Sequence, residues 1–181
     1  LTLTDAGVLD PNAPTEAVVV HTSTHQTVNL TGKEEGVLVA CGGFTGGYTL
    51  FIKNNKAYYD YNYYNGLYYT LESPPLPKGE VDIKFVFTET GGVTKGLPGG
   101  KGELHINGKK VDDMKMPDMH ISTFSLSETF DVGIDAGTPV SDKYRVKNHY
   151  PFTGELDKVI VMLTGEDEFK DPKEASVVES N

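Results

Sequence analysis

Short runs of alternating apolar and polar residues constrain this chain more than any other feature of its sequence. In EVDIKFVF the side chains of Val81, Ile83, Phe85 and Phe87 face one way, and the residues between them are mostly polar. A period of two places every second side chain on the same face, which is typical of a strand with one buried side. The pattern therefore predicts antiparallel sheets, each with one face in the core.

Two pairs of residues predict hairpins between such runs. Asn54 and Asn55 interrupt YTLFIKNNKAYYDYNYY, and asparagine tolerates the positive φ that a tight turn needs. Asn107-Gly108 in GELHINGKKV is the strongest short-range signal for a type I′ turn. GELDKVIVML predicts a further strand near the C-terminus.

The length and composition fit one all-β domain. The chain has 181 residues, with 20 glycines, 10 prolines, 10 tyrosines and no tryptophan, which suits many short strands and turns. We expect about ten strands in a two-sheet antiparallel jelly-roll sandwich of the concanavalin A type. The predicted sandwich covers residues 17–163, with a lead-in or linker at 1–16 and a polar tail at 164–181 that has room for a short helix.

Charge and hydropathy argue against nucleic acid as a partner and against a membrane-spanning helix. The formal net charge of −10 would repel a polyanion, so nucleic acid is not expected as a partner. The sequence contains no apolar run near the ~20 residues that a membrane-spanning helix needs. The single Cys41 excludes an internal disulfide, and its place in VLVACGG predicts a buried small residue.

Seven tyrosines occur within thirteen residues in AYYDYNYYNGLYY. Tyrosine rings stack on the apolar faces of sugars and offer a hydroxyl at the edge, so this run suggests a glycan-binding face. The alternative is that alternate tyrosines pack the sheet, while the others cover its outer face or a neighbouring domain. The candidate ligand or docking residues are Tyr58, Tyr59, Tyr61, Tyr63 and Tyr64.

The acids of SETFDVGIDAGTPVSDKY allow two interpretations. Asp131 and Asp135, with carbonyl oxygens from the turn between them, would suit the flexible oxygen shell of calcium. Without the regular acid spacing of a calcium loop, the same carboxylates would instead accept backbone N–H bonds and stabilise the turn.

Other chemistry has weaker support. Glu155 and Asp157 share a strand face at a spacing that would suit a glycosidase. His21 and His25 also share a face, but zinc would need a third ligand that the sequence does not supply. The sequence contains no GxSxG motif, so it does not predict a serine hydrolase.

Five segments in the same order suggest a family. GVLVACGGFTGGYTLFIKNNKAYYDYNYY, LPKGEVDIKFVF, GKGELHINGKKV, FDVGIDAGTPVSDKY and FTGELDKVIVML together resemble the C-terminal β-sandwich of large bacterial arylsulfatases. The resemblance covers residues 36–163. It implies a concanavalin A/laminin G-like sandwich attached to a sulfatase catalytic domain. Cys41 is followed by Gly-Gly-Phe-Thr and not by the family's Cys-x-Pro-x-Arg motif, so no catalytic residue is expected here.

This resemblance implies a non-catalytic domain that packs against the catalytic domain of the same polypeptide, whose activity would be sulfate-ester hydrolysis. No cofactor is expected in this chain beyond the structural calcium considered above for Asp131 and Asp135. A periplasmic or secreted location is favoured slightly over a cytoplasmic one. The start at Leu1 suggests a processed protein or a fragment. The residues alone leave open a lectin-like module that binds carbohydrate through its tyrosines.

Overall fold

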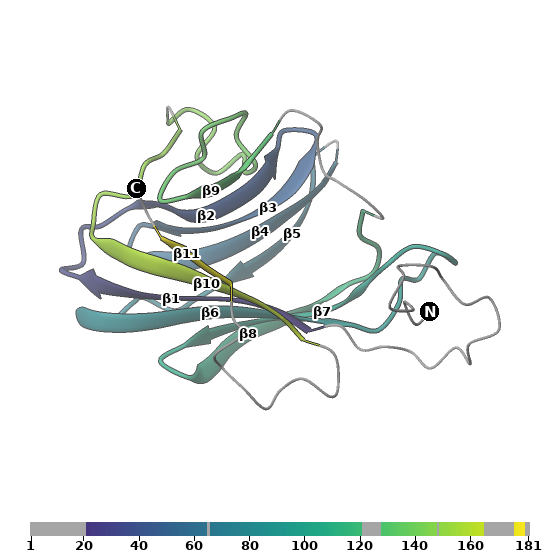
Figure 1. The fold of residues 1–181 in the computed structure, drawn as a ribbon, viewed down its shortest axis with the longest axis horizontal. Coiled ribbons are helices and arrows are strands. Elements are labelled where there is room, and N and C mark those ends of the chain that lie inside the picture. The colour runs from purple at the N-terminus through teal and green to yellow at the C-terminus, as the bar shows by residue number, and fades with distance from the viewer. Residues whose placement is uncertain (1–20, 65, 121–127, 148, 165–175, 180–181) are drawn as a thin grey trace.

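The computed structural model describes residues 21–64, 66–120, 128–147, 149–164 and 176–179, and within them the chain forms eleven β-strands and no helix (Figure 1). The strands are β1 (His21–Leu30), β2 (Gly36–Gly43), β3 (Gly46–Lys53), β4 (Lys56–Tyr64), β5 (Leu67–Glu72), β6 (Gly79–Glu89), β7 (Gly100–Ile106), β8 (Lys109–Met116), β9 (Phe130–Val132), β10 (Leu156–Thr164) and β11 (Ser176–Glu179).

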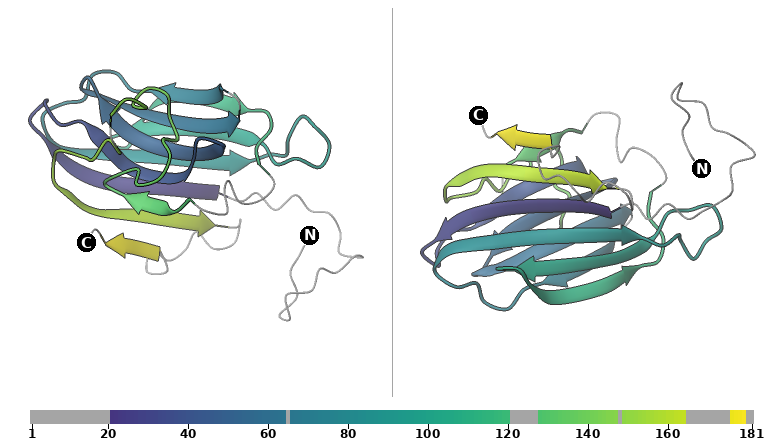
Figure 2. Two further views of the ribbon diagram at one scale, coloured as in Figure 1. Left: turned by 90° about the horizontal axis from the view of Figure 1, so that it is seen from above. Right: turned by 60° about the horizontal axis from the view of Figure 1, so that its bottom comes forward.

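The strands form two stacked antiparallel sheets. One has six strands in the order β11-β10-β1-β6-β7-β8, and the other has five in the order β5-β4-β3-β2-β9. Figure 2 shows the two layers from above and with the bottom of the molecule turned forward. The predicted all-β jelly-roll sandwich is confirmed.

Both predicted hairpins are present. Asn54 and Asn55 have φ angles of 50° and 58° between β3 and β4, and Asn107 and Gly108 have 50° and 74° between β7 and β8. Two successive residues of positive φ give the turn that matches the twist of a two-residue hairpin. The turn residues therefore set the register of both strand pairs.

The main core lies between the sheets. Val81, Ile83 and Phe85 of β6 point inward, as their spacing predicted, and pack against side chains that include Leu50 and Ile52 of β3. The Tyr59 ring of β4 stacks on Phe85 across the core, with ring centroids 3.5 Å apart. Burying each such side chain stabilises the fold by about 1.5–3 kcal/mol.

A second, smaller core lies on the outer face of the five-stranded sheet. Residues 133–147 and 149–152, which we call the covering segment, lie over β9, β2 and β3 (Figure 1). Tyr144 and Tyr150 of this segment pack against Phe51 of β3, and the Tyr144 ring meets the Phe51 ring edge-on at 5.0 Å. The covering segment thus closes a sheet face that would otherwise be exposed.

Ser176–Glu179, inside the predicted tail, pairs with β10 as the strand β11. The predicted lead-in at 1–16 lies outside the described residues, and the domain boundaries stay predictions. In the part of the chain that the structure describes, no helix has the length and apolar character to cross a membrane.

Candidate functional site

Several connections meet at one end of the sandwich, which we call the loop end. β2 and β4 each pair antiparallel with β3, so the β2–β3 and β4–β5 turns lie at the same end. The residues after β8 also lie there, because the His120 backbone N–H donates to the Tyr61 hydroxyl at 2.9 Å. The β6–β7 loop is joined to them through a Met119 N–H bond to the Pro98 carbonyl at 2.7 Å. Loops gathered at one end of a rigid sandwich are where binding sites commonly form.

Exposed apolar side chains gather at this end. Among the described residues the exposed large apolar side chains are Phe44, Tyr64, Leu67, Val93, Phe130 and Val146. Phe44 and Val93 lie in the β2–β3 and β6–β7 connections, and Tyr64 and Leu67 are the strand residues on either side of the β4–β5 turn. Phe130 pairs with Cys41 near the end of β2. Apolar groups concentrated on one exposed region mark an interaction site more often than scattered ones do.

Phe44 is the centre of a charged and aromatic group. Its ring is 52% exposed, and the Arg145 guanidinium carbon lies 4.9 Å from the ring centroid. Arg145 also pairs with Asp142, with 3.2 Å between Nη1 and Oδ1, and both side chains are about half exposed. An exposed cation over an aromatic ring contributes about 0.5–1 kcal/mol. The group therefore presents donors, acceptors and apolar surface side by side.

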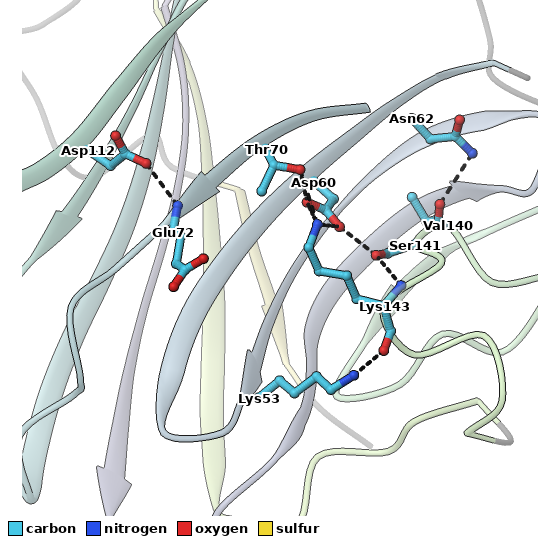
Figure 3. A network of polar contacts seen from close by, with 9 residues as sticks. All are labelled: Lys53, Asp60, Asn62, Thr70, Glu72, Asp112, Val140, Ser141 and Lys143. Carbon is cyan, nitrogen blue, oxygen red and sulfur yellow. Dashed lines mark hydrogen bonds and ion pairs between the residues drawn. The ribbon is translucent and has the colours of Figure 1, made fainter. Parts of the chain in front are cut away.

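Asn62 holds this group in place. Its buried side-chain amide donates to the carbonyls of Gly43, Phe44 and Val140 at 3.0–3.2 Å. The bond to Val140 is visible in Figure 3. The Phe44 backbone N–H donates to Thr138 Oγ1 at 2.9 Å. The β2–β3 turn is thus tied to both β4 and the covering segment, which gives the site a rigid base.

Tyr64 has an unusual backbone. Its φ is 135°, and its side chain is 58% exposed at the end of β4. A positive φ is unfavourable for a bulky residue, and such conformations cluster at ligand sites. The β4–β5 pairing shifts register between Asn62 and Tyr64, which accounts for the local distortion.

A buried polar network fastens the covering segment to the sheet (Figure 3). Asp60 of β4 is fully buried, and both its oxygens accept from Lys143 Nζ at 2.7 Å. Thr70 and Ser141 donate their hydroxyls to the same carboxylate, and Lys53 donates to the Lys143 carbonyl. Ser141 is fully buried and shares the Asp60 carboxylate with Lys143 and Thr70, so this network is a structural tie between β4 and the covering segment.

The five tyrosines predicted as one face do not share a surface. Tyr59 and Tyr61 lie in the main core, while Tyr58 packs on the second core. Tyr63 is half-buried beside Tyr69 and His120, so Tyr64 alone of the five is exposed. Successive side chains of a strand point to opposite sides, so the five rings divide between the two faces of β4, as the alternative interpretation expected. A role of these tyrosines in binding a ligand or a partner domain stays a prediction. Burial raises the pKa of Tyr61 to about 12.

The two acids predicted for calcium are bonded within the turn. Asp135 is buried and accepts from the Val140 N–H at 2.9 Å and the Tyr144 hydroxyl at 2.6 Å. Asp131 accepts from the Thr129 hydroxyl and from the Ala136 N–H. Among the described residues no group of three or more His, Cys, Asp or Glu side chains is placed to hold a metal. A structural calcium stays a prediction.

The structure adds little support for the remaining candidate residues. Glu155 is exposed just before β10, and the side chains of Asp157, His21 and His25 lie outside what the structure describes. Cys41 is partly buried, and burial raises the pKa of its thiol, which disfavours a reactive thiolate.

Sequence reasoning did not single out Phe44, Arg145 and Asp142 as one site. A signal was present in GGFTGG, where an aromatic residue stands between two pairs of glycines in a turn and so is expected to be exposed. A second signal was Arg145, the one arginine of the chain. Neither signal shows that residues about a hundred positions apart meet.

No protein-family model and no curated protein matches this chain. Solved structures with a similar arrangement include the CBM40 module of the Ruminococcus gnavus IT-sialidase bound to α2,3-sialyllactose, at 15% identity and a TM-score of 0.48, covering 80% of this chain and 76% of that one. The same module without the sugar gives 14% identity and 0.46, with coverages of 80% and 75%. The receptor-binding domain of botulinum neurotoxin type G gives 12% and 0.42, covering 82% of this chain and 34% of the toxin chain. At these values the likeness concerns the fold and says nothing of function.

The resemblance to the C-terminal sandwich of arylsulfatases was wrong. No family model or curated relative supports it, and the similar solved structures are sialidase carbohydrate-binding modules and neurotoxin receptor-binding domains. The matching segments were strand and turn patterns, which any antiparallel sandwich of this kind needs. The implied sulfatase catalytic partner has no support.

Proposed function

We propose that this chain is a carbohydrate-binding module of the lectin type, with its glycan site at the loop end. The observation that carries the proposal is the exposed Phe44 ring with the Arg145–Asp142 pair against it. Sugars present apolar C–H faces that stack on aromatic rings, and hydroxyls that need donors and acceptors. This group offers both kinds of contact within one small area.

The rigidity of the site supports binding. Asn62 and Thr138 fix the backbone on either side of the Phe44 ring, and the Asp60 network fixes the covering segment that carries Arg145. A site that is ordered before the ligand arrives loses less conformational freedom on binding. An exposed platform of this kind can therefore bind a glycan without a deep cavity.

Glycan-array screening of the purified chain, followed by titration calorimetry, tests this proposal. We expect binding to at least one glycan, and Phe44→Ala and Tyr64→Ala each to weaken it about tenfold, the equivalent of roughly 1.4 kcal/mol. Thr27→Ala, on an exposed position of β1 in the other sheet, is the control and should bind like the unmodified chain. The proposal fails if no glycan binds, or if both aromatic variants bind with unchanged affinity.

A further inference from the structure

The cation beside Phe44 already has a carboxylate partner. Arg145 pairs with Asp142 at 3.2 Å, and its neighbour Lys143 pairs with the buried Asp60 at 2.7 Å. A guanidinium that already has a carboxylate partner offers less net attraction to a second anion. Any acidic ligand would have to compete with Asp142 for Arg145.

A further carboxylate lies close to the Phe44 turn. Thr138 Oγ1 accepts from the Phe44 N–H at 2.9 Å and donates to Glu128 at 2.7 Å, so one hydroxyl separates the Glu128 carboxylate from the Phe44 backbone. The Thr138 N–H also donates to Glu128, and both donors are neutral groups that leave its negative charge in place. The surroundings of the ring therefore repel anions, in keeping with the net charge of −10.

Tyr68 adds a neutral hydroxyl beside the pair. Burial, reinforced by the charge of Asp142, raises its pKa. The phenol thus keeps its proton at neutral pH. A neutral phenol hydroxyl can both donate and accept a hydrogen bond.

Two adjacent sugar hydroxyls match this arrangement. A guanidinium presents a planar fork of N–H donors, while a carboxylate presents acceptor oxygens. Each hydroxyl of a vicinal diol both donates and accepts, so a side-by-side donor and acceptor can satisfy two of them together. The exposed rings of Phe44 and Tyr64 supply apolar surface for the C–H face of the sugar.

We propose that the Arg145–Asp142 pair, set against Phe44, recognises adjacent hydroxyls of a neutral sugar and selects against glycans that carry a carboxylate or sulfate. This inference rests on the proposed glycan-binding function and adds the class of ligand. It also assigns roles: Asp142 accepts from the sugar, and Arg145 donates to it.

The test compares neutral oligosaccharides with their uronate-containing or sulfated counterparts on the unmodified chain. We expect the neutral forms to bind at least tenfold tighter, with an affinity that does not change between 50 mM and 500 mM NaCl. Binding of an anion by a guanidinium would weaken over that range because salt screens exposed charges. This comparison needs no variant, so it cannot fail through misfolding.

Two variants then probe the pair. Asp142→Asn and Arg145→Lys should each weaken binding of the neutral sugar several-fold, because one loses an ionised acceptor and the other the planar fork. Their thermal unfolding should match that of the unmodified chain, since both side chains are about half exposed. Tighter binding of acidic glycans, or stronger binding by Asp142→Asn, overturns this inference and leaves the proposed function standing. Absence of binding to either class overturns the proposed function itself.

Discussion

At the scale of single residues, Asp135 shows how burial changes a carboxyl group. Its Oδ2 accepts from Val140 and Tyr144. Burial nevertheless raises the pKa of Asp135, and the negative charges of Asp131 and Glu128 raise it further. The hydrogen bonds from Val140 and Tyr144 lower the pKa but do not offset this rise. The acid that the sequence suggested for calcium is therefore a buried group that holds its proton more tightly than a free carboxyl does. No pattern of neighbouring letters predicts this, because burial depends on how the covering segment folds back.

A pH dependence follows from Asp135. Asp135 binds its proton more tightly in the folded state. In the unfolded state the pKa of an aspartate is about 3.9. Its contribution to stability is therefore fully present below that pH and is lost as pH rises through the folded-state pKa. We expect the stability of the unmodified chain, minus that of Asp135→Asn, to fall between pH 4 and pH 7. Urea unfolding of both proteins measures this difference, in which the other carboxyls cancel. A difference that stays constant or rises over this range would contradict the assignment.

The tyrosines of β4 mark the limit of prediction from residues. Alternation correctly implies that Tyr59 and Tyr61 share a face, and the structure places both in the core. The exposure of Tyr64 depends on a register shift beside it, which cannot be predicted from the sequence. Composition identified an aromatic-rich strand, but only the pairing of strands shows which ring reaches the surface.

At the scale of elements, the hairpins were predictable and the covering segment was not. The pairs Asn54-Asn55 and Asn107-Gly108 specify their turns locally, so two adjacent residues are enough to predict each hairpin. The covering segment has no regular pattern, and it is held by contacts from distant strands such as those of Asp60 and Phe51. Side chains that meet across about eighty positions leave no local signal in a single sequence.

The ion pair between Asp60 of β4 and Lys143 of the covering segment leads to a quantitative prediction. Lys143→Met removes the cation that compensates the fully buried Asp60. We expect a loss in the free energy of unfolding near the low end of about 3–5 kcal/mol, because Lys143 itself keeps about a third of its side chain exposed. Urea unfolding provides the measurement. The double variant Asp60→Asn with Lys143→Met is the control and should recover part of the loss, since no buried charge then remains. A cost below about 1 kcal/mol for Lys143→Met would show that the pair is weakly coupled.

At the scale of the whole molecule, alternation and turn residues predict a sandwich, but they do not say which connections converge. The loop end forms because β2, β4 and the segment after β8 finish at the same side, and this depends on strand order. The site drawn from Phe44, Arg145 and Asp142 is therefore a property of topology. This explains why the fold could be predicted from the sequence while the candidate site could not.

The two cores should unfold together. β2 and β3 contribute side chains to both, since Leu50 and Ile52 face the main core while Phe51 faces the covering segment. The segment has little regular structure of its own, so it cannot persist once the sheet that carries Phe51 has melted. We expect one transition in urea, with coincident far-ultraviolet circular dichroism and tyrosine fluorescence. A Tyr144→Phe variant should shift the midpoint of both signals equally, because it removes the hydroxyl bond to Asp135 within the second core. If the fluorescence change precedes the loss of sheet signal, the covering segment opens separately, and the Phe44 platform would then lose the rigid base that the proposed glycan binding requires.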